Sequence, residues 1–285
     1  MGMLINIDNG GTLTDICVLK DNNFYTTKTL TTPYDLSKCF FDGLKDVSKA
    51  VYGQEDVTRL LAEVEHIRYS TTQGTNAIVE RKGPKLGMVV NKSNVKLIKS
   101  MQEEDPDLFT FLVGDRIEEI EWADLNDEVS AAETITSITR LTARGANRVV
   151  VCFDNDDATH CESQFKRIAF NSYPRHLLGA VPMLFASELA EDVSSNRRGW
   201  TALINSFLHP AMESFLYNAE NRLREYRTKN PLLIFRNDGD ASRVAKTIAL
   251  KTYSSGPRGG MEGVKEFSKK YKLNNVISMD IGGTT

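Results

Sequence analysis

The residues that most clearly suggest chemistry form a short pattern, Asp-x-Gly-Gly-Thr, which occurs twice. It reads DNGGT at Asp8–Thr12 and DIGGT at Asp280–Thr284, 272 residues later. Each copy directly follows a short apolar run of the length that forms a strand. A spacing this long does not fit a small tandem repeat and favours two related domains that face one another.

The residue types in this pattern suit phosphate binding. Adjacent glycines lack a Cβ, so the backbone can turn sharply and bring N–H groups close to phosphate oxygens, while threonine adds a hydroxyl donor. A single Gly-Gly hairpin turn is weak evidence because such turns are common, but two near-identical copies at strand ends favour a phosphate site. The predicted cradle is Gly10, Gly11, Thr12, Gly282, Gly283 and Thr284.

The acidic residue that opens each copy has a separate predicted role. A carboxylate at a strand end can hold hydrated Mg²⁺ or orient an attacking hydroxyl or water. Asp8 and Asp280 are therefore the candidate catalytic and metal-binding residues, with Thr14 and Asp15 supporting the first loop.

The elements that must position the first loop are short strands joined by tight turns. β-rich runs at residues 3–7, 16–20 and 24–30 predict an antiparallel meander. Rossmann and Walker nucleotide sites have a glycine-rich loop that opens into a helix. The strand-turn-strand order therefore separates this site from both, and the sequence contains neither GxGxxG nor GxxxxGK[ST].

Strand and helix patterns alternate along the rest of the chain, which predicts a mixed α/β fold. Further strands are expected at residues 66–70, 85–90, 148–153, 180–186 and 232–235, and a closing strand at 276–279 leads into the second loop. Helices are expected at residues 35–49, 56–65, 124–144, 162–172, 196–226 and 261–270, with Pro210 breaking or bending the fifth.

Two polar segments leave alternatives open. Thr71, Thr72, Thr75 and Asn76 follow a predicted strand and could form a capped turn that leads into a helix, or a substrate-side or inter-domain surface. The segment 254–260, SSGPRGG, precedes a predicted helix, where its N–H groups could bind an anion or simply form a structural loop.

Composition excludes several classes of protein. The chain has 285 residues, 41% hydrophobic and 26% charged, as in ordinary globular proteins. A net charge of −3 gives no basic footprint for nucleic acid or an anionic membrane. The apolar runs are strand-sized and the N-terminus has no signal-peptide pattern, which favours the cytoplasm. The four cysteines are expected to be reduced and mostly buried, and the four histidines lack metal-site spacing.

The paired loops resemble the two phosphate motifs of the actin/sugar-kinase/Hsp70 superfamily, and further segments resemble the hydantoinase A / 5-oxoprolinase family. DNGGTLTD resembles that family's DVGGTFTD, and KTLTTP at residues 28–33 resembles its next segment. STTQGTNAIVERKG at 70–83 resembles HGTTxxTNAxxERKG, SGPRGG resembles SGPAGG, and DIGGTT resembles DMGGTSTD. The similarity follows the family's order over essentially the whole chain.

The resemblance implies an actin/ribonuclease-H-like ATPase fold whose mixed sheet starts in the antiparallel meander. Residues 1–185 would form the family's N-terminal domain with the first phosphate loop, and residues 186–285 would begin the hydantoinase A domain and end in the second loop. Family members continue for several hundred residues past the second loop, so the second domain is expected to be truncated here. Three alternatives stay open: the sequence is a cut piece of a longer protein, the second half comes from another polypeptide, or the chain is a degenerate remnant.

The implied activity is ATP- and Mg²⁺-dependent phosphorylation of a cyclic amide or ketone carbonyl oxygen, followed by hydrolysis of the amide or carboxylation of the ketone. This chain alone is expected to be inactive. The alternative is a partial or non-catalytic subunit of a multi-subunit ketone carboxylase or hydrolase. A sugar or acetate kinase shares the loops but not the segments at 71–83 and 254–260.

The sequence departs from the family pattern at several positions. The histidine that opens the HGTT segment is replaced by Tyr69 or Ser70, and the phenylalanine of the first loop by Leu13. The family's QSNGG stretch reads RNDGD at residues 236–240, with one glycine fewer and added charge. These changes concern the substrate and leave the predicted nucleotide loops in place.

Overall fold

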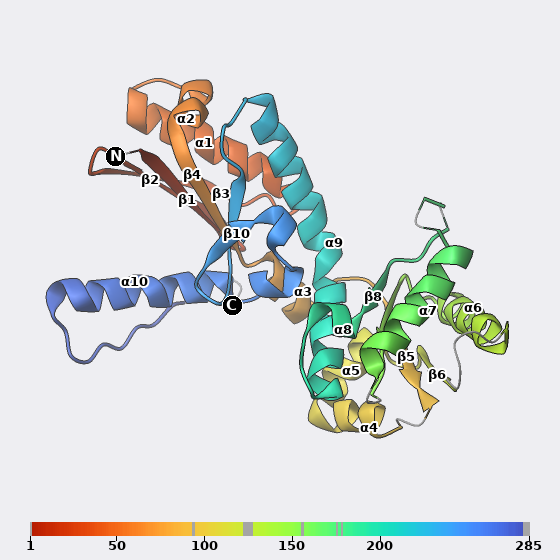
Figure 1. Ribbon diagram of the computed structural model, residues 1–285. Helices are drawn as coiled ribbons and strands as arrows, with labels where there is room; N and C mark the ends of the chain where they lie inside the picture. The colour runs from red at the N-terminus through yellow and green to blue at the C-terminus, as the bar shows by residue number, and fades with distance from the viewer. Residues whose placement is uncertain are drawn as a thin grey trace. The chain divides into compact units, whose positions relative to one another are not determined.

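The chain divides into two compact units (Figure 1). The computed structural model describes residues 2–92, 95–121, 128–154, 157–174, 176–177 and 179–281. Unit 1 comprises Met1–Lys82 and Ala211–Thr285, and unit 2 comprises Gly83–Pro210. The domain boundary predicted between residues 185 and 186 separates two family domains along the sequence, whereas these units are compact bodies in space. That boundary therefore stays a prediction.

Unit 1 is built on a mixed six-stranded sheet with the strand order β10-β9-β4-β1-β2-β3. The first three strands form the antiparallel meander that the sequence predicts, and β4 and β9 then add in parallel. The strands are β1 (Met3–Asn9), β2 (Leu13–Lys20), β3 (Asn23–Leu30), β4 (Val64–Thr71), β9 (Leu232–Phe235) and β10 (Ala241–Arg243).

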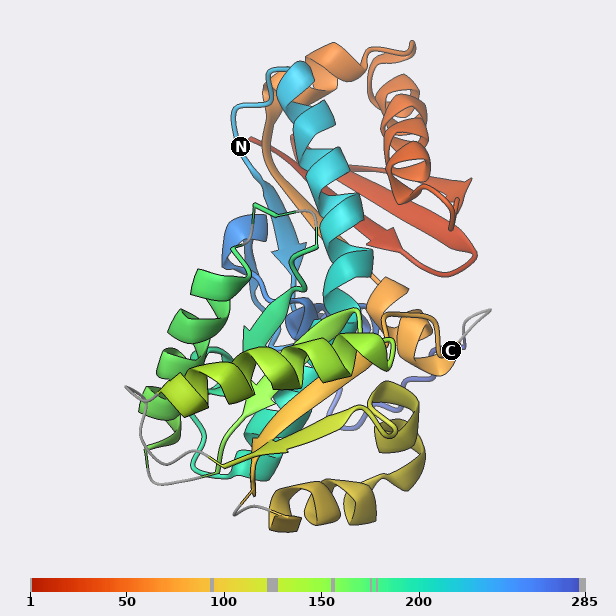
Figure 2. The ribbon, with the colours of Figure 1, turned by 90° about the vertical axis from the view of Figure 1, so that its right-hand side faces the viewer.

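One face of this sheet is the core of unit 1. Alternate residues of the strands are buried there, among them Ile5, Ile16 and Tyr69. They pack under α1 (Leu36–Tyr52) and the part of α9 (Ser195–Glu225) that follows Pro210, as Figure 2 shows for α9. The Tyr69 ring stacks on Phe215 of α9, with ring centroids 4.7 Å apart. The period of two along each strand places the alternate residues on the opposite face, here called the polar face because it carries Asp8, Asp15 and Lys28.

Local signals explain why α1 forms where the sequence predicts a helix. The side chain of Asp35 accepts a hydrogen bond from the Ser37 N–H at 3.0 Å, which satisfies a free donor of the first turn. Gly53 ends the helix in the left-handed conformation, at φ 78°. Helix α2 (Val57–Glu63) begins in the same way, because Asp56 accepts from the Arg59 N–H.

A charged cluster joins β2, α1 and α2. The Glu63 carboxylate lies 2.7 Å from Lys20 Nζ and 2.8 Å from Arg59 Nε, and the Tyr52 hydroxyl donates to it at 2.9 Å. The hydrogen bonds from Lys20 and then Arg59 lower the pKa of Glu63 from 4.5 to about 2. The ionised form of Glu63 is therefore favoured in the folded protein.

Replacing Glu63 with glutamine should make the free energy of unfolding of unit 1 fall less steeply as the pH is lowered. A carboxyl whose pKa is lowered by folding contributes stability above its unfolded pKa, and this is lost as the pH falls through the folded value of about 2. Glu63→Gln should lower the free energy of unfolding at pH 7 by less than about 1 kcal/mol, since the cluster is largely exposed. Urea unfolding between pH 7 and pH 2 measures the difference. Equal pH slopes for both proteins would contradict this prediction.

Unit 2 is a small α/β unit with a four-stranded, wholly parallel sheet in the order β6-β5-β7-β8. Both faces are covered, as is usual for parallel sheets, and Figure 2 shows α6 and α7 on one of them. The strands are β5 (Leu86–Asn91), β6 (Ile117–Ile120), β7 (Arg148–Cys152) and β8 (Met183–Phe185). The helices are α4 (Val95–Glu104), α5 (Pro106–Leu112), α6 (Glu128–Ala143), α7 (Ala158–Ser172), α8 (Ala186–Leu189) and the first part of α9.

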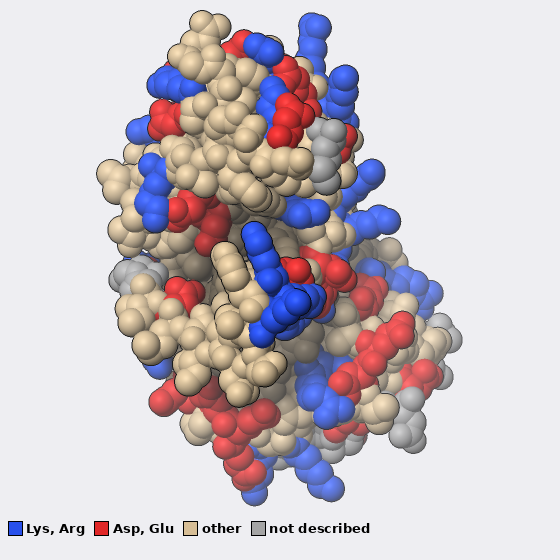
Figure 3. All heavy atoms as spheres, turned by 90° about the vertical axis from the view of Figure 1, so that its left-hand side faces the viewer, with Lys and Arg blue, Asp and Glu red and all other residues tan. Residues whose placement is uncertain are grey.

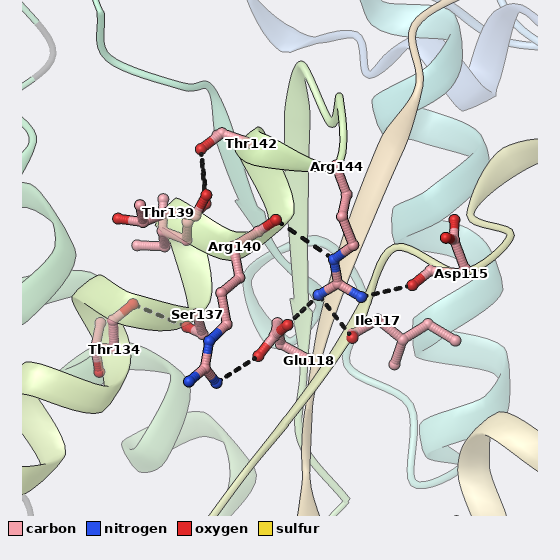
Figure 4. Close-up of polar contacts among 10 residues, drawn as sticks. Asp115, Ile117, Glu118, Thr134, Ser137, Thr139, Arg140, Thr142 and Arg144 are labelled. Carbon is pink, nitrogen blue, oxygen red and sulfur yellow. Dashed lines mark hydrogen bonds and ion pairs between the residues drawn. The ribbon is translucent and has the colours of Figure 1, made fainter.

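The end of α6 is fixed to β6 by an arginine (Figure 4). The Arg144 guanidinium donates to the backbone carbonyl of Asp115 at 2.7 Å and to that of Ile117 at 3.2 Å, and it pairs with the Glu118 carboxylate. Arg140, one turn earlier in α6, lies 3.5 Å from the same carboxylate. Planar, forked donors make arginine well suited to such a junction.

A buried carboxylate organises the segment that follows β7. Glu162 of α7 is fully buried and accepts hydrogen bonds from the Phe153 N–H at 3.0 Å and the Ser187 N–H at 2.8 Å. The Ser187 hydroxyl donates to it at 2.6 Å. Buried Arg198 donates to the Phe153 carbonyl at 2.8 Å, so both the backbone N–H and the backbone carbonyl of Phe153 are held by charged side chains.

The long helix α9 passes through Pro210 without ending, so of the two predicted effects of this proline a break is wrong, and a bend stays a prediction. Helix α10 (Ser255–Tyr271) begins six residues earlier than the sequence predicts, and the glycines expected to precede it lie inside its first turns. In Figure 3, lysine and arginine side chains, drawn in blue, gather over the end of α10, which points toward the viewer. Lys269 and Lys270 in its last turn complement the helix dipole.

The closing strand predicted at 276–279 is not formed. The segment has no regular secondary structure, and Ile277 is 95% exposed. A strand is stabilised by hydrogen bonds to a neighbouring strand, and none of the strands in the described part of the chain pairs with this segment.

Three of the four cysteines are buried, as expected, and Cys17 is half-buried. Among the described helices, none combines the length and the apolarity that a membrane span requires.

Candidate active site

Asp8 lies near the end of β1 on the polar face of the unit 1 sheet. Its register partners are Asp15 on β2 and Ser70 on β4. The Ser70 hydroxyl donates a hydrogen bond to Asp8 Oδ1. Asp15 in turn pairs with Lys28, its register partner on β3, at 3.0 Å. Four neighbouring strands therefore each place one polar residue in the same row.

The first glycine loop forms the tight turn between β1 and β2. The Gly10 N–H donates to the Leu13 carbonyl at 3.0 Å, and a Cβ at Gly10 would lie 2.9 Å from that oxygen. Glycine is required there because a side chain would force the turn open. Thr31 fixes the loop from the far end of β3, since its hydroxyl donates to the Gly10 carbonyl at 2.8 Å and its N–H to the Thr12 carbonyl at 2.9 Å.

Three buried polar side chains form a hydrogen-bonded network on the core side of the loop. Asn9 donates through Nδ2 to the Thr14 hydroxyl at 2.7 Å, and it accepts from the Thr71 hydroxyl at 3.1 Å. All three side chains are buried. The structure thus places Thr14 and Thr71 beneath the loop, and their predicted contact with nucleotide or substrate stays a prediction.

The start of α10 contacts this region from far along the sequence. The Ser255 hydroxyl donates to the Thr71 carbonyl at 3.3 Å, and the Ser254 N–H donates to the Thr75 hydroxyl at 3.1 Å. A Cβ on Gly256 would lie 3.7 Å from Asp8 Oδ1. The positive end of the α10 dipole is therefore close to the Asp8 carboxylate.

Two cavities open beside the loop, both within unit 1. The first, about 420 Å³, lies over the polar face of the sheet and is lined by Asp8, Asp15, Arg68, Ser70, Gly256 and Glu262, among others. Cys17 also lines it, and burial raises the pKa of the Cys17 thiol. The second, about 300 Å³, is lined by Gly10, Gly11, Thr72, Gln73, Asn76 and Glu80, among others.

The structure thus brings Asp8 and Asp15 to one cavity, and Gly10, Gly11, Thr72 and Asn76 to the other. Thr12 is exposed at the tip of the loop.

The second loop is described only at its start. Asp280 is exposed in the irregular segment that follows α10. The predicted cradle residues Gly282, Gly283 and Thr284 lie outside the described residues. Their role, like that of Asp280, stays a prediction.

Sequence reasoning missed two contributors to the site. Lys28 and Ser70 appear in the sequence only as parts of family-like segments, yet they flank the acidic pair in the row. Strand periodicity could have placed each on a polar face, but it does not fix the register between strands that are distant in the sequence.

Comparison with known proteins identifies the family of the chain. The family description "Hydantoinase/oxoprolinase N-terminal region" matches residues 4–170, and "Hydantoinase/oxoprolinase" matches residues 198–285. The chain belongs to the hydantoinase/oxoprolinase family. The resemblance to this family predicted from the sequence is confirmed.

Curated relatives of this family member are longer proteins. The acetophenone carboxylase gamma subunit of Aromatoleum aromaticum is 25% identical over 99% of this chain and 41% of its own length. The 5-oxoprolinase 1 of Arabidopsis thaliana is 24% identical over 98% of this chain and 25% of its own length. The chain therefore spans about two fifths or less of these relatives.

Solved structures confirm the fold class. The nucleotide-free structure of an acetone carboxylase has a TM-score of 0.81 at 20% identity, covering 99% of this chain and 43% of that one. An ATP-dependent caprolactamase from Pseudomonas jessenii has a TM-score of 0.76 at 20% identity, covering 98% and 42%. At these identities the likeness concerns the fold alone.

Proposed function

We propose that this chain provides the first phosphate-binding half of an ATP-dependent enzyme that activates the carbonyl oxygen of a cyclic amide by phosphorylation before hydrolysis. The observation that carries the proposal is the placement of Asp8. It lies on the polar face of the sheet, next to the Gly10–Gly11 turn and the N-terminus of α10. Two related enzymes, 5-oxoprolinase and caprolactamase, bear names that fit this chemistry.

The residues present suit ATP and Mg²⁺. The Ser70 hydroxyl donates a hydrogen bond to Oδ1 of Asp8, so Oδ2 is the oxygen that would face a hydrated cation. The Gly10 N–H already donates to the Leu13 carbonyl, so the N–H groups of Gly11 and Thr12 are the ones that would approach phosphate oxygens, with no Cβ at positions 10 and 11 to obstruct them. When bound, ATP supplies the phosphoryl group and Mg²⁺ offsets its charge. Asp8 would hold the cation or orient the attacking group, and Gly10, Gly11 and Thr12 would bind the phosphates.

The second loop has the matching proposed role. Asp280, Gly282, Gly283 and Thr284 would contact the nucleotide from the other side, with Asp280 as the second carboxylate. Thr72, Thr75 and Asn76 would border the substrate, since Thr72 and Asn76 line the cavity beside Gly10. We further infer that the protein acts in the cytoplasm.

A second candidate is a subunit of an ATP-dependent ketone carboxylase. It is favoured by the names of two relatives, the acetophenone carboxylase gamma subunit and the acetone carboxylase beta subunit. In that case the activated oxygen would be a ketone oxygen and the rest of the site would come from a partner subunit. Turnover assays with a cyclic amide, and with a ketone plus bicarbonate, separate the two.

Calorimetric titration with ATP and Mg²⁺ tests the nucleotide site. We expect weak or no binding to this chain alone, because the proposed site needs both loops. We expect Mg²⁺-dependent binding once the remainder of the family fold is supplied, on the same polypeptide or as a partner subunit. Absence of binding in the complemented protein would contradict the proposal. Tight binding to this chain alone would show that the first half suffices.

A further inference from the structure

The most specific feature that the proposed function leaves unexplained is the row of side chains across the polar face of the unit 1 sheet. Lys28, Asp15, Asp8 and Ser70 come from β3, β2, β1 and β4, and each is the register partner of the next. Side chains directly opposite one another on adjacent strands are close enough to interact. The register therefore places four polar side chains next to one another.

The centre of the row would be unfavourable if it were left alone. Asp8 and Asp15 are directly opposed, and like charges in that position repel. Lys28 Nζ lies 3.0 Å from Asp15 Oδ1 and offsets the charge of that carboxylate. Both members of this pair are about half exposed, with side-chain exposures of 56% and 51%. Its role is thus better sought in local electrostatics than in stability.

The other end of the row fixes the direction of Asp8. The Ser70 hydroxyl donates to Oδ1, and the backbone at Gly256 approaches that same oxygen. Oδ1 is therefore the oxygen that β4 contacts and that the start of α10 approaches. The second oxygen, Oδ2, is the one left for chemistry.

We propose that Lys28 and Ser70 are positioning residues for Asp8. In this inference, which rests on the proposed function, Lys28 keeps Asp15 from repelling the Asp8 carboxylate, and Ser70 binds Oδ1 so that Asp8 acts through Oδ2 alone. Asp15 is the charge that Lys28 offsets. The serine hydroxyl is essential to this arrangement, because neither glycine nor alanine at position 70 could donate the hydrogen bond.

Crystal structures of this chain test the positioning directly. In Ser70→Ala we expect the Asp8 carboxylate to change rotamer or to occupy two, with the β1 and β4 backbones unchanged, whereas Ser70→Thr should keep the original rotamer. Ser242→Ala, on β10 of the same sheet, is the matched control and should leave Asp8 in place. An unchanged Asp8 rotamer in Ser70→Ala would overturn the inference, even if no enzyme activity were ever measured.

Turnover by the complemented enzyme gives the second readout. Ser70→Ala and Lys28→Met should each lower kcat by about tenfold to a hundredfold, the range that misplacement of a reacting group produces. The KM for ATP should change by less than about threefold, and Ser70→Thr should restore kcat. Wild-type kcat in Ser70→Ala, alongside an inactive Asp8→Asn, would overturn the positioning role alone. Full activity of Asp8→Asn would instead contradict the proposed function.

Discussion

Replacing Asp8 with alanine or asparagine is expected to lower the kcat of ATP-dependent turnover by at least about 10³-fold, the scale on which single groups that stabilise the transition state act. Phosphoryl transfer depends mainly on positioning and charge stabilisation, so loss of the carboxylate removes the group proposed to hold the cation or orient the attacking group. Asparagine is the sharper test, because it keeps an oxygen that can accept the Ser70 hydrogen bond.

The fold should survive this change, because the Asp8 side chain is exposed on the polar face of the sheet. Steady-state ATP hydrolysis by the complemented enzyme measures the effect, and urea unfolding of the same variants checks stability. Asp46→Asn, an exposed aspartate on α1, is the control and should keep wild-type turnover. Wild-type turnover in Asp8→Asn would show that Asp8 is not a catalytic residue.

Replacing Glu162 with glutamine is expected to destabilise unit 2 by about 2–4 kcal/mol, although the two side chains have nearly the same shape. Three hydrogen-bond donors point at the carboxylate, from the backbones of Phe153 and Ser187 and from the Ser187 hydroxyl. Glutamine offers one acceptor oxygen and an NH₂ group, so at least one buried N–H would face another donor.

The electrostatics of Glu162 agree with this expectation. Burial raises the pKa of its carboxyl, while the Ser187 and Phe153 hydrogen bonds oppose that shift by favouring the charged form. These hydrogen bonds therefore offset the free-energy cost of burying a charged carboxylate.

Urea unfolding of Glu162→Gln and wild type provides the measurement. Glu188→Gln is the matched control, because Glu188 lies in the neighbouring helix α8 and pairs with Lys166 at the surface. Its effect should be below about 0.5 kcal/mol. The cost of Glu162→Gln should also shrink in a Ser187→Ala background. Equal stability of Glu162→Gln and wild type would show that the carboxylate does not organise this segment.

Several elements could be predicted because they depend on local pattern. The meander of β1, β2 and β3 follows from short β-rich runs separated by tight turns, and its strands pair with their neighbours in sequence. Helix α1 follows from its apolar spacing and from Asp35 at its start. Where pairing is local, the sequence carries both the element and its partner.

Other elements could not be predicted because their partners are distant. The expected strand at 276–279 has strand-like residues, but no strand in the described part of the chain pairs with it. Glu162 reads in the sequence as an ordinary helical residue, and only packing against the segment after β7 shows that it is buried.

The sequence by itself determined the residue types of the first loop, and from them came the prediction that the loop binds phosphate. A turn with glycines at positions 10 and 11, next to an aspartate at the end of an apolar strand, suits a phosphate ligand. This prediction needs only residue types and the local backbone, both of which the sequence supplies. Only the tertiary structure decided what surrounds Asp8. The β1–β4 register sets Ser70 beside Asp8, and the start of α10 brings Gly256 near it, although these residues lie 62 and 248 positions further along the chain. A strand's period fixes the face of each side chain, but cross-strand register is fixed only when the sheet assembles.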